Sequence, residues 1–251
     1  MDTTKAVILR DDGDFDWVVI PSGSKSTIQT AQSVLDEVAE KAKIAIKNID
    51  YTIATGVGRE YITFANRELQ ESICLAKGID ALLPSTRTLL DLGARKSLVI
   101  RCKEGKVMKL AMSGKCAAGT GAFLEMVSNV LSINIYDMDK LSFKSKENLE
   151  ILSNCSVFAE SEIISLVHGG ARPEDIIRGI FRGLAGRIFS QVLELGTEKD
   201  ITLVGGAANS KAMIAALEEK LGFKILVPEN PKTVAALGAA LIGQEMKGRI
   251  S

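Results

Sequence analysis

Two cysteines occupy positions where a thiol could do chemistry. Cys116 lies in the segment KCAAGTG (residues 115–121), and Cys155 begins the segment CSVFAESE (residues 155–162). Each cysteine closes a polar loop and comes just before an apolar-periodic stretch that predicts a helix. A helix N-terminus offers unpaired N–H groups and a positive dipole end, which favour a thiolate or a bound anion.

An iron–sulfur cluster is one anion that suits this setting. A cubane cluster takes four thiolates, and this chain offers two in matching positions. Two chains related by a two-fold axis would supply four, with the cluster on the axis. The other two cysteines, Cys74 and Cys102, sit inside apolar patterns and are expected to be small buried side chains. The sequence contains no C-x-x-C pair, so an ordinary zinc site within one chain is not expected.

The composition excludes several classes of protein. The chain has 251 residues, a formal net charge of zero and no block of basic residues, which argues against nucleic acid or an anionic membrane as the main partner. The N-terminus lacks a basic-then-apolar signal pattern, and the most apolar stretch is far shorter than the roughly 20 residues that span a bilayer. We therefore expect a cytoplasmic protein.

The predicted elements occur in two successive sets, each with a hairpin, a helix, a strand and a helix. The first set has strands at 5–9, 17–20 and 51–55 and helices from 27 and over 68–77; the second has strands at 88–92, 97–102, 106–112, 201–204 and 223–227 and helices at 121–131, 159–167, 173–195, 211–221 and 233–246. Such a duplication predicts an α/β protein with two halves, residues 1–86 and 87–251, and a nucleotide cleft between them. Both candidate cysteines fall in the second half, and the last helix is expected to pack back on the first.

Two strand ends in the second half carry residues suited to a nucleotide. Asp91 ends a buried strand and Gly93 follows; the carboxylate could hold a Mg²⁺-bound water, while the glycine lets backbone N–H groups approach a phosphate. Gly205 and Gly206 follow another strand, where a purine or ribose can lie against backbone, with Asn209 as a polar contact. On spacing alone, either place could also be a plain strand-to-turn junction.

Taken together, these residues resemble the activator ATPases of 2-hydroxyacyl-CoA dehydratases and the related ATPase subunits of benzoyl-CoA reductase, the BadF/BadG/BcrA/BcrD type. The resemblance runs nearly end to end, and its most specific pieces are the two cysteine segments. Support comes from ATGVGR (54–59), VGG (204–206) and ALGAAL (236–241).

The resemblance implies a duplicated actin/sugar-kinase/Hsp70-like (ribonuclease H-like) fold that binds ATP or ADP with Mg²⁺. It also implies one [4Fe–4S] cluster shared by two like or closely related subunits through Cys116 and Cys155 of each. ATP hydrolysis would change the angle between the cluster helices. A low-potential electron, taken from reduced ferredoxin or flavodoxin, would then pass to an enzyme that reduces an acyl-CoA or aryl-CoA.

The sequence departs from that family at three places. The family opens with a strand and phosphate loop G-I-D-x-G-S-T-T-T-K, whereas this sequence starts at what would be the loop's end. We expect either a start codon assigned too late or a loss of full ATPase chemistry, with the first strand missing and a frayed terminus. The second loop, D-I-G-G-Q-D in dehydratase activators, is DLGARK (91–96), a form closer to one of the benzoyl-CoA reductase ATPase chains, and the adenine-loop glutamine is replaced by Lys232. By this resemblance the catalytic residue is Asp91, the cluster ligands are Cys116 and Cys155, and the nucleotide contacts are Thr3, Thr4, Lys5, Gly93, Arg95, Gly205, Gly206, Asn209 and Lys232.

Three functions remain open on these observations. The first is an ATP-driven electron-transfer activator, and the second is a cluster-bearing subunit whose unlike partner hydrolyses ATP. The third is a small-molecule kinase of the same fold with both candidate thiols buried, which would give no reason for two cysteines at helix starts.

Overall fold

In the computed structural model, which describes residues 2–23, 25–113, 119–151, 156–196 and 198–250, the chain divides into two units. Unit 1 comprises Met1–Arg87, Cys102–Lys109 and Pro228–Ser251, and unit 2 comprises Thr88–Arg101 and Leu110–Val227. The sequence predicted a boundary after residue 86, with the last helix packing back on the first half. In the structure the C-terminal segment belongs to unit 1, and the tip of one hairpin, Cys102–Lys109, belongs to it as well.

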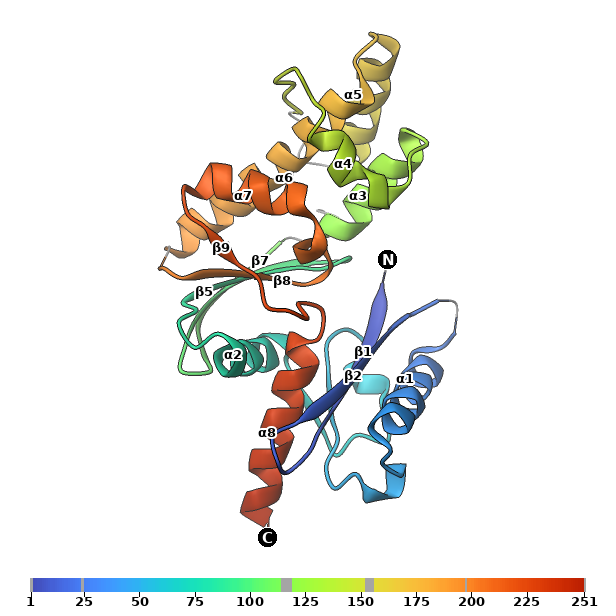
Figure 1. Ribbon diagram of the computed structural model, residues 1–251, viewed down its shortest axis with the longest axis vertical. Coiled ribbons are helices and arrows are strands. Elements are labelled where there is room, and N and C mark those ends of the chain that lie inside the picture. Colours follow the sequence, from blue (N-terminus) through green and yellow to red (C-terminus); the bar gives the residue numbers. More distant parts are fainter. Residues whose placement is uncertain (1, 24, 114–118, 152–155, 197, 251) are drawn as a thin grey trace. The chain divides into compact units, whose positions relative to one another are not determined.

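Unit 1 holds two short sheets and three long helices (Figure 1). Strands β1 (Thr3–Leu9) and β2 (Phe15–Pro21) pair antiparallel, and β3 (Ile53–Thr55) pairs parallel with β4 (Arg67–Leu69). The helices are α1 (Thr27–Ala42), α2 (Glu71–Leu82) and α8 (Val234–Ile250), with short 3-10 turns at Ile46–Asn48 and Arg59–Tyr61.

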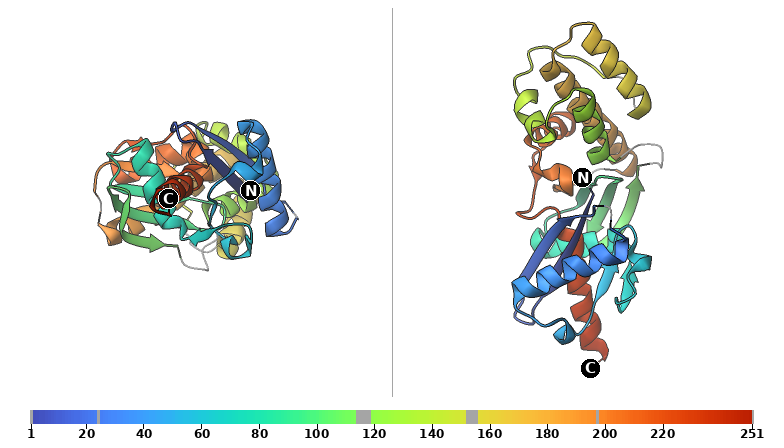
Figure 2. Two further views of the ribbon diagram at one scale, coloured as in Figure 1. Left: turned by 90° about the horizontal axis from the view of Figure 1, so that it is seen from below. Right: turned by 90° about the vertical axis from the view of Figure 1, so that its right-hand side faces the viewer.

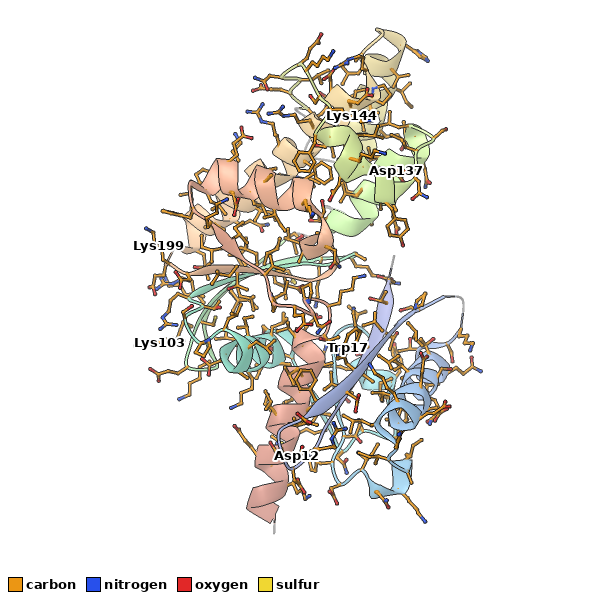
Figure 3. All side chains as sticks on the ribbon, in the orientation of Figure 1. Asp12, Trp17, Lys103, Asp137, Lys144 and Lys199 are labelled. Carbon is orange, nitrogen blue, oxygen red and sulfur yellow. The ribbon has the colours of Figure 1, made fainter. Side chains whose placement is uncertain are left out.

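Local sequence explains α1 and its packing. Ser26 caps the first turn and forms a capping box with Gln29, and Lys43 ends the helix in the left-handed conformation, with a φ of 56°. Val34, Val38 and Ala39 from α1 form a small core with Ile8 of β1 and Val18 of β2. Trp17 on β2, labelled in Figure 3, carries the ammonium of Lys41 at 4.7 Å from its ring centroid.

The two sheets of unit 1 are separated by a cavity of about 450 Å³. Residues 4–11 line one side and residues 48–55 the other, while side chains of α1 and α8 cover the two faces. Figure 2 shows α1 and α8 on opposite sides of the β1–β2 hairpin. Each sheet therefore keeps one strand edge that faces this space.

Helices α2 and α8 of unit 1 cross at very short range. A Cβ added to Gly238 would overlap the carbonyl oxygen of Cys74, and one on Gly78 would overlap the carbonyl oxygen of Val234. Only glycine allows the two backbones to approach this closely. The sequence's expectation that the last helix returns to the first half corresponds to this crossing.

Unit 2 is built on a continuous sheet with the strand order β7-β6-β5-β8-β9. Its strands are β5 (Thr88–Leu92), β6 (Ser97–Lys103), β7 (Lys106–Met112), β8 (Ile201–Val204) and β9 (Ile225–Leu226), and its helices are α3 (Thr120–Val130), α4 (Met138–Ser142), α5 (Ser156–His168), α6 (Pro173–Leu195) and α7 (Lys211–Leu221). Short 3-10 turns lie at Ile135–Asp137 and Gly206–Asn209. Strand β5 is antiparallel to β6 and parallel to β8.

The core of unit 2 is large and lies between the sheet and its helices. It joins Leu90 and Leu203 of the central strands to Phe123 of α3, Phe181 of α6 and Leu217 of α7, all nearly fully buried. Lys199, labelled in Figure 3, lies 4.4 Å above the ring of Phe223 at the edge of this unit. No described helix is long and apolar enough to cross a membrane.

Three local predictions differ from the structure. The helix expected over 68–77 is preceded by β4 and extends from Glu71 to Leu82. The expected strand at 223–227 is limited to Ile225–Leu226. Thr3 and Thr4, expected on a frayed terminus, are paired in β1 opposite Pro21 and Ile20, because backbone pairing with β2 holds the first residues in the strand.

Candidate nucleotide site

The carboxyl ends of β5 and β8 form the candidate nucleotide site of unit 2. These parallel strands pair in register, so that Asp91 lies opposite Val204, and each strand then enters a glycine-bearing loop. Asp91 is 7% exposed. Ligands in open α/β sheets bind outside the carboxyl ends of parallel strands, so the two motifs identified in the sequence meet where such a ligand would lie.

The two glycines after β8 have different surroundings. Gly205 has a φ of +86°, and a Cβ there would lie 2.6 Å from Oδ1 of Asp91 and 2.7 Å from the carbonyl oxygen of Leu92. Gly206 is exposed, and a Cβ on it would meet nothing within 4 Å. Gly205 is therefore required for the strands to come together, whereas Gly206 borders open space that a flat ring or sugar can occupy.

The loop after Asp91 is fastened to the start of α3. The N–H of Gly121 donates to the carbonyl oxygen of Gly93 at 3.1 Å, and the N–H of Ala122 donates to the carbonyl oxygen of Ala94 at 3.0 Å. A Cβ on Gly121 would lie 2.8 Å from Cα of Ala94, and one on Gly119 would overlap the backbone of the same loop. Two backbone hydrogen bonds and two close glycine contacts therefore join the loop to the start of α3.

A buried hydroxyl pair adds to this connection. The hydroxyl groups of Ser97 and Thr120 lie 3.2 Å apart, which joins the first residue of β6 to the first residue of α3. Ser97 also accepts the N–H of Ser113 through its carbonyl oxygen, and its own N–H donates to the Ser113 hydroxyl, both at 3.0 Å. Sequence reasoning identified the glycines of GTG (119–121) but missed their contact with the loop; the pair of glycines flanking a threonine was the available signal.

The remaining nucleotide candidates fall in two places. Arg95 is exposed in the loop of unit 2, and Asn209 is exposed at the end of the turn after β8, its amide donating to the carbonyl oxygen of Gly206 at 3.4 Å. Thr3, Thr4 and Lys5 belong to β1 of unit 1, and Lys232 is exposed before α8. The Thr4 hydroxyl pairs with that of Ser22, and the Lys5 ammonium donates to the carbonyl oxygen of Thr3. Their contact with a nucleotide stays a prediction.

The candidate cluster ligands Cys116 and Cys155 lie outside the described residues. The helices that follow them are described: α3 begins at Thr120, α5 begins at Ser156, and the two helices pack against each other. Among the described residues, no group of three or more His, Cys, Asp or Glu side chains is arranged to hold a metal ion.

The other two cysteines are buried, as the sequence predicted. Burial raises the pKa of the Cys102 thiol to about 11, with the Asp80 carboxylate acting in the same direction and Arg87 against it. Burial also raises the pKa of the Cys74 thiol. Both side chains therefore stay protonated near neutral pH and are poor ligands and nucleophiles.

Comparison with known proteins identifies a family. A sequence model described as the BadF/BadG/BcrA/BcrD ATPase family matches residues 2–243. The activator of lactoyl-CoA dehydratase of Anaerotignum propionicum is 36% identical over 247 residues, covering 97% of this chain and 94% of that protein. The 2-hydroxyisocaproyl-CoA dehydratase activator of Clostridioides difficile is 34% identical, covering 95% and 90%. A subunit of the benzoyl-CoA reductase of Thauera aromatica is 29% identical, covering 95% and 88%.

Solved structures give the same result. Component A of the (R)-2-hydroxyglutaryl-CoA dehydratase of Acidaminococcus fermentans superposes with a TM-score of 0.94 at 33% identity, covering 98% of this chain and 95% of that one. The C. difficile 2-hydroxyisocaproyl-CoA dehydratase activator with bound ADPNP superposes with a TM-score of 0.89 at 30% identity, covering 100% and 98%. A glucokinase from Streptomyces griseus, at a TM-score of 0.58 and 8% identity, shares the fold alone. The fold is thus the actin/sugar-kinase/Hsp70-like ATPase fold predicted from the sequence.

Proposed function

This chain belongs to the BadF/BadG/BcrA/BcrD ATPase family, and on that premise we propose that it is an ATP-dependent iron–sulfur activator. In this proposal it passes a low-potential electron to an enzyme that reduces an acyl-CoA or aryl-CoA, with ferredoxin or flavodoxin as the donor. Relatives named as dehydratase activators and as part of a benzoyl-CoA reductase support the partner class.

The nucleotide half of the proposal rests on the ends of β5 and β8. Asp91 would orient a Mg²⁺-bound water, and the loop from Gly93 would present backbone N–H groups to a phosphate. Open space beside Gly206 would take the base or ribose. The related C. difficile activator was solved with ADPNP bound, which supports a nucleotide as the ligand.

The part of the proposal that concerns the cluster rests on the positions of Cys116 and Cys155 in the sequence and on the chemistry of their thiols. Cys155 immediately precedes α5 and Cys116 lies four residues before α3, so two helix N-termini would favour the thiolate form of both. Two thiolates from each of two chains match the four that a [4Fe–4S] cluster takes. When bound, such a cluster supplies one-electron transfer at low potential.

The single observation that carries the proposal is the pair of backbone hydrogen bonds between the loop after Asp91 and the start of α3. A phosphate that shifts this loop would shift α3 with it, since the backbone at Gly119 and Gly121 lies directly against the backbone of the loop. Because α3 packs on α5, nucleotide state would alter how the starts of the helices that follow Cys116 and Cys155 are held.

The test is anaerobic reconstitution of the full chain with iron and sulfide. We expect about four iron atoms per two chains and thiolate-to-iron absorption. Cys116→Ser and Cys155→Ser should each lose the iron, while Cys74→Ser and Cys102→Ser, the buried controls, should keep it. Unchanged iron content in Cys116→Ser would show that the cluster assignment is wrong.

A second candidate is a cluster-bearing subunit whose unlike partner hydrolyses ATP; it is favoured by the loop DLGARK (91–96), whose form resembles one of the two unlike ATPase chains of benzoyl-CoA reductase. An ATPase rate measured on the reconstituted chain alone decides between the two candidates. Turnover that Asp91→Asn abolishes supports the activator. Iron and ADP binding without turnover supports the second candidate.

A further inference from the structure

Helix α4 carries an aspartate that contacts the chain just after the turn that follows β8. Asp139 accepts two hydrogen bonds there: its Oδ1 from the hydroxyl of Ser210 at 2.5 Å, and its Oδ2 from the N–H of Lys211 at 2.6 Å. Ser210 and Lys211 follow Asp139 by 71 and 72 positions in the sequence. The carboxylate therefore joins α4 to the place where the turn Gly206–Asn209 ends and α7 begins.

These two bonds add to a helix start that is already capped. The hydroxyl oxygen of Ser210 accepts from the N–H of Met213 at 3.1 Å, which is the usual N-cap contact of a serine. Helix α7 does not need Asp139 for this cap. Asp139 instead fixes the position of the junction, because it binds both the last residue before the helix and the first residue in it.

The turn before this junction is also held from below. The N–H of Ser210 donates to the carbonyl oxygen of Ala207 at 3.0 Å, and Ala207 and Ala208 are 7% and 3% exposed in the core of unit 2. The two exposed residues of the turn are Gly206 and Asn209. These are the residues proposed to lie beside the base or ribose, so the carboxylate of α4 helps to fix the turn that presents them.

The segment that carries Asp139 reaches the other strand-end loop as well. We call residues 119–142, which contain α3 and α4, the bridging segment. N–H groups at its start donate to the carbonyl oxygens of Gly93 and Ala94, and Asp139 near its end accepts from the junction after β8. Met138, next to Asp139, is 1% exposed in the core. One packed segment therefore contacts both loops that are proposed to hold the nucleotide.

We propose that Asp139 is a positioning residue for the base and ribose of the nucleotide. It acts through Ser210 and Lys211, and it keeps the exposed backbone of Gly206 and the amide of Asn209 where the ligand meets them. Hydrogen bonds to a carboxylate are stronger than those between neutral groups, which suits this role. The inference rests on the proposed function, since it takes the ligand to be a nucleotide.

The test measures the affinity of the full chain for ADP by calorimetry. Asp139→Ala removes both acceptors and should weaken ADP binding by about tenfold. Asp139→Asn keeps both contacts, because its amide oxygen accepts from the N–H of Lys211 and its NH₂ group donates to the hydroxyl oxygen of Ser210. Its affinity should stay within about threefold of that of the unsubstituted chain. Equal loss in the two variants would overturn the positioning role, since the charge alone would then account for the effect.

Glu218 supplies a matched control on α7. Its carboxylate also accepts one backbone N–H, that of Ile225 at 3.0 Å, and one side-chain donor, Lys224 at 2.9 Å. Glu218→Ala and Asp139→Ala should each lower the unfolding temperature by about 2–4 °C, but only Asp139→Ala should weaken ADP binding. Equal weakening by both would show that general loss of stability around α7 is the cause, and would overturn the proposal.

A double variant tests whether Asp139 acts through the turn. The side chain added in Gly206→Val occupies the space expected for the base or ribose, so adding Asp139→Ala should weaken ADP binding by less than about twofold more. A further tenfold loss would place the effect of Asp139 elsewhere. The two proposals fail in different ways. An unsubstituted chain that does not bind ADP overturns the proposed function and this inference with it, whereas ADP binding that Asp139→Ala leaves unchanged overturns this inference alone.

Discussion

The two units share an order of elements but are held together by different contacts. Unit 2 has a continuous sheet with β5 fully buried, and one large core connects that sheet to α3, α6 and α7. Unit 1 has two separate short sheets, and the core between α1 and the β1–β2 hairpin contains five buried residues, Ile8, Val18, Val34, Val38 and Ala39. Its helices α2 and α8 approach so closely that a Cβ on Gly78 or Gly238 would overlap the backbone of the other helix.

This difference indicates which substitutions should destabilise each unit. In unit 2, Gly119, Gly121 and Gly205 leave no room for a Cβ beside Asp91 and the start of α3. Stability and the candidate site therefore depend on the same glycines. In unit 1 the glycines without room for a Cβ at the α2–α8 crossing lie between two helices, and the strands border a cavity. We therefore expect unit 1 to be most sensitive to substitutions at its helix crossing. Unit 2 should be most sensitive to substitutions in its strand-end loops.

The largest effect should come from the helix crossing of unit 1. Gly238→Ala places a Cβ on the carbonyl oxygen of Cys74 and must push α8 away from α2, at a cost of about 3 kcal/mol or more in the free energy of unfolding. Gly243→Ala, on the same helix, meets side chains of Tyr51 and Ile53 at ordinary distances of 3.6–3.8 Å. It should be neutral or stabilise by up to about 1 kcal/mol. Urea unfolding measures both, and similar values for the two variants would contradict this account of unit 1.

The second effect separates stability from binding in unit 2. Gly205→Ala combines a positive φ with a clash against Asp91 and should cost about 2 kcal/mol or more. Gly206→Val adds its side chain to open space, so the unfolding temperature should stay within about 2 °C. The same side chain should weaken ADP binding by about tenfold or more, because it occupies the space expected for the base or ribose. Calorimetry that shows unaltered ADP affinity in Gly206→Val would move the site elsewhere.

Periodicity in the sequence predicted most elements because the apolar residues of each helix and strand fall on one face or in one buried run. The strand β5, TLLDL, has three leucines beside Thr88 and Asp91, and all five residues are buried. The strand β4 was missed because Arg67-Glu68-Leu69 is short and mostly charged, and two of its three residues are exposed. Its pairing with β3 depends on tertiary context that local propensity does not encode.

In the candidate site, too, some features could be predicted from the sequence and others could not. Asp91, Gly93 and Gly205 could be identified from the sequence because each follows an apolar run at a strand end. The contact of Gly121 with Ala94 and the hydroxyl pair of Ser97 and Thr120 could not, because each joins residues more than twenty positions apart. The crossing at Gly78 and Gly238 likewise has no local signal, since a glycine inside a helix lowers propensity wherever it packs.

The smallest effect is a loss of stability at low pH, and it should appear in unit 2 alone. Asp175, which is 1% exposed, ties the segment before α5 to α6. Its Oδ1 accepts from the N–H groups of Glu147 and Lys146 and from the Ser145 hydroxyl, and both oxygens accept from Arg172. The N–H of Glu147 acts most strongly, and together these donors hold the pKa of Asp175 well below its ordinary value, although burial acts in the opposite direction.

A lowered pKa in the folded state means that ionised Asp175 stabilises the fold at pH values above its ordinary pKa of about 3.9. This contribution is lost as the pH falls below that value toward the folded pKa. Asp175→Asn should therefore lower the urea midpoint at pH 7, and the gap to the native protein should narrow at pH 3. In unit 1, Asp50→Asn removes an exposed partner of Lys247 and should change the midpoint little at either pH, since exposed ion pairs contribute at most about 1 kcal/mol. Amide exchange of residues 145–147 assigns the change to unit 2, and a gap that stays constant from pH 7 to pH 3 would show that ionised Asp175 does not stabilise this segment.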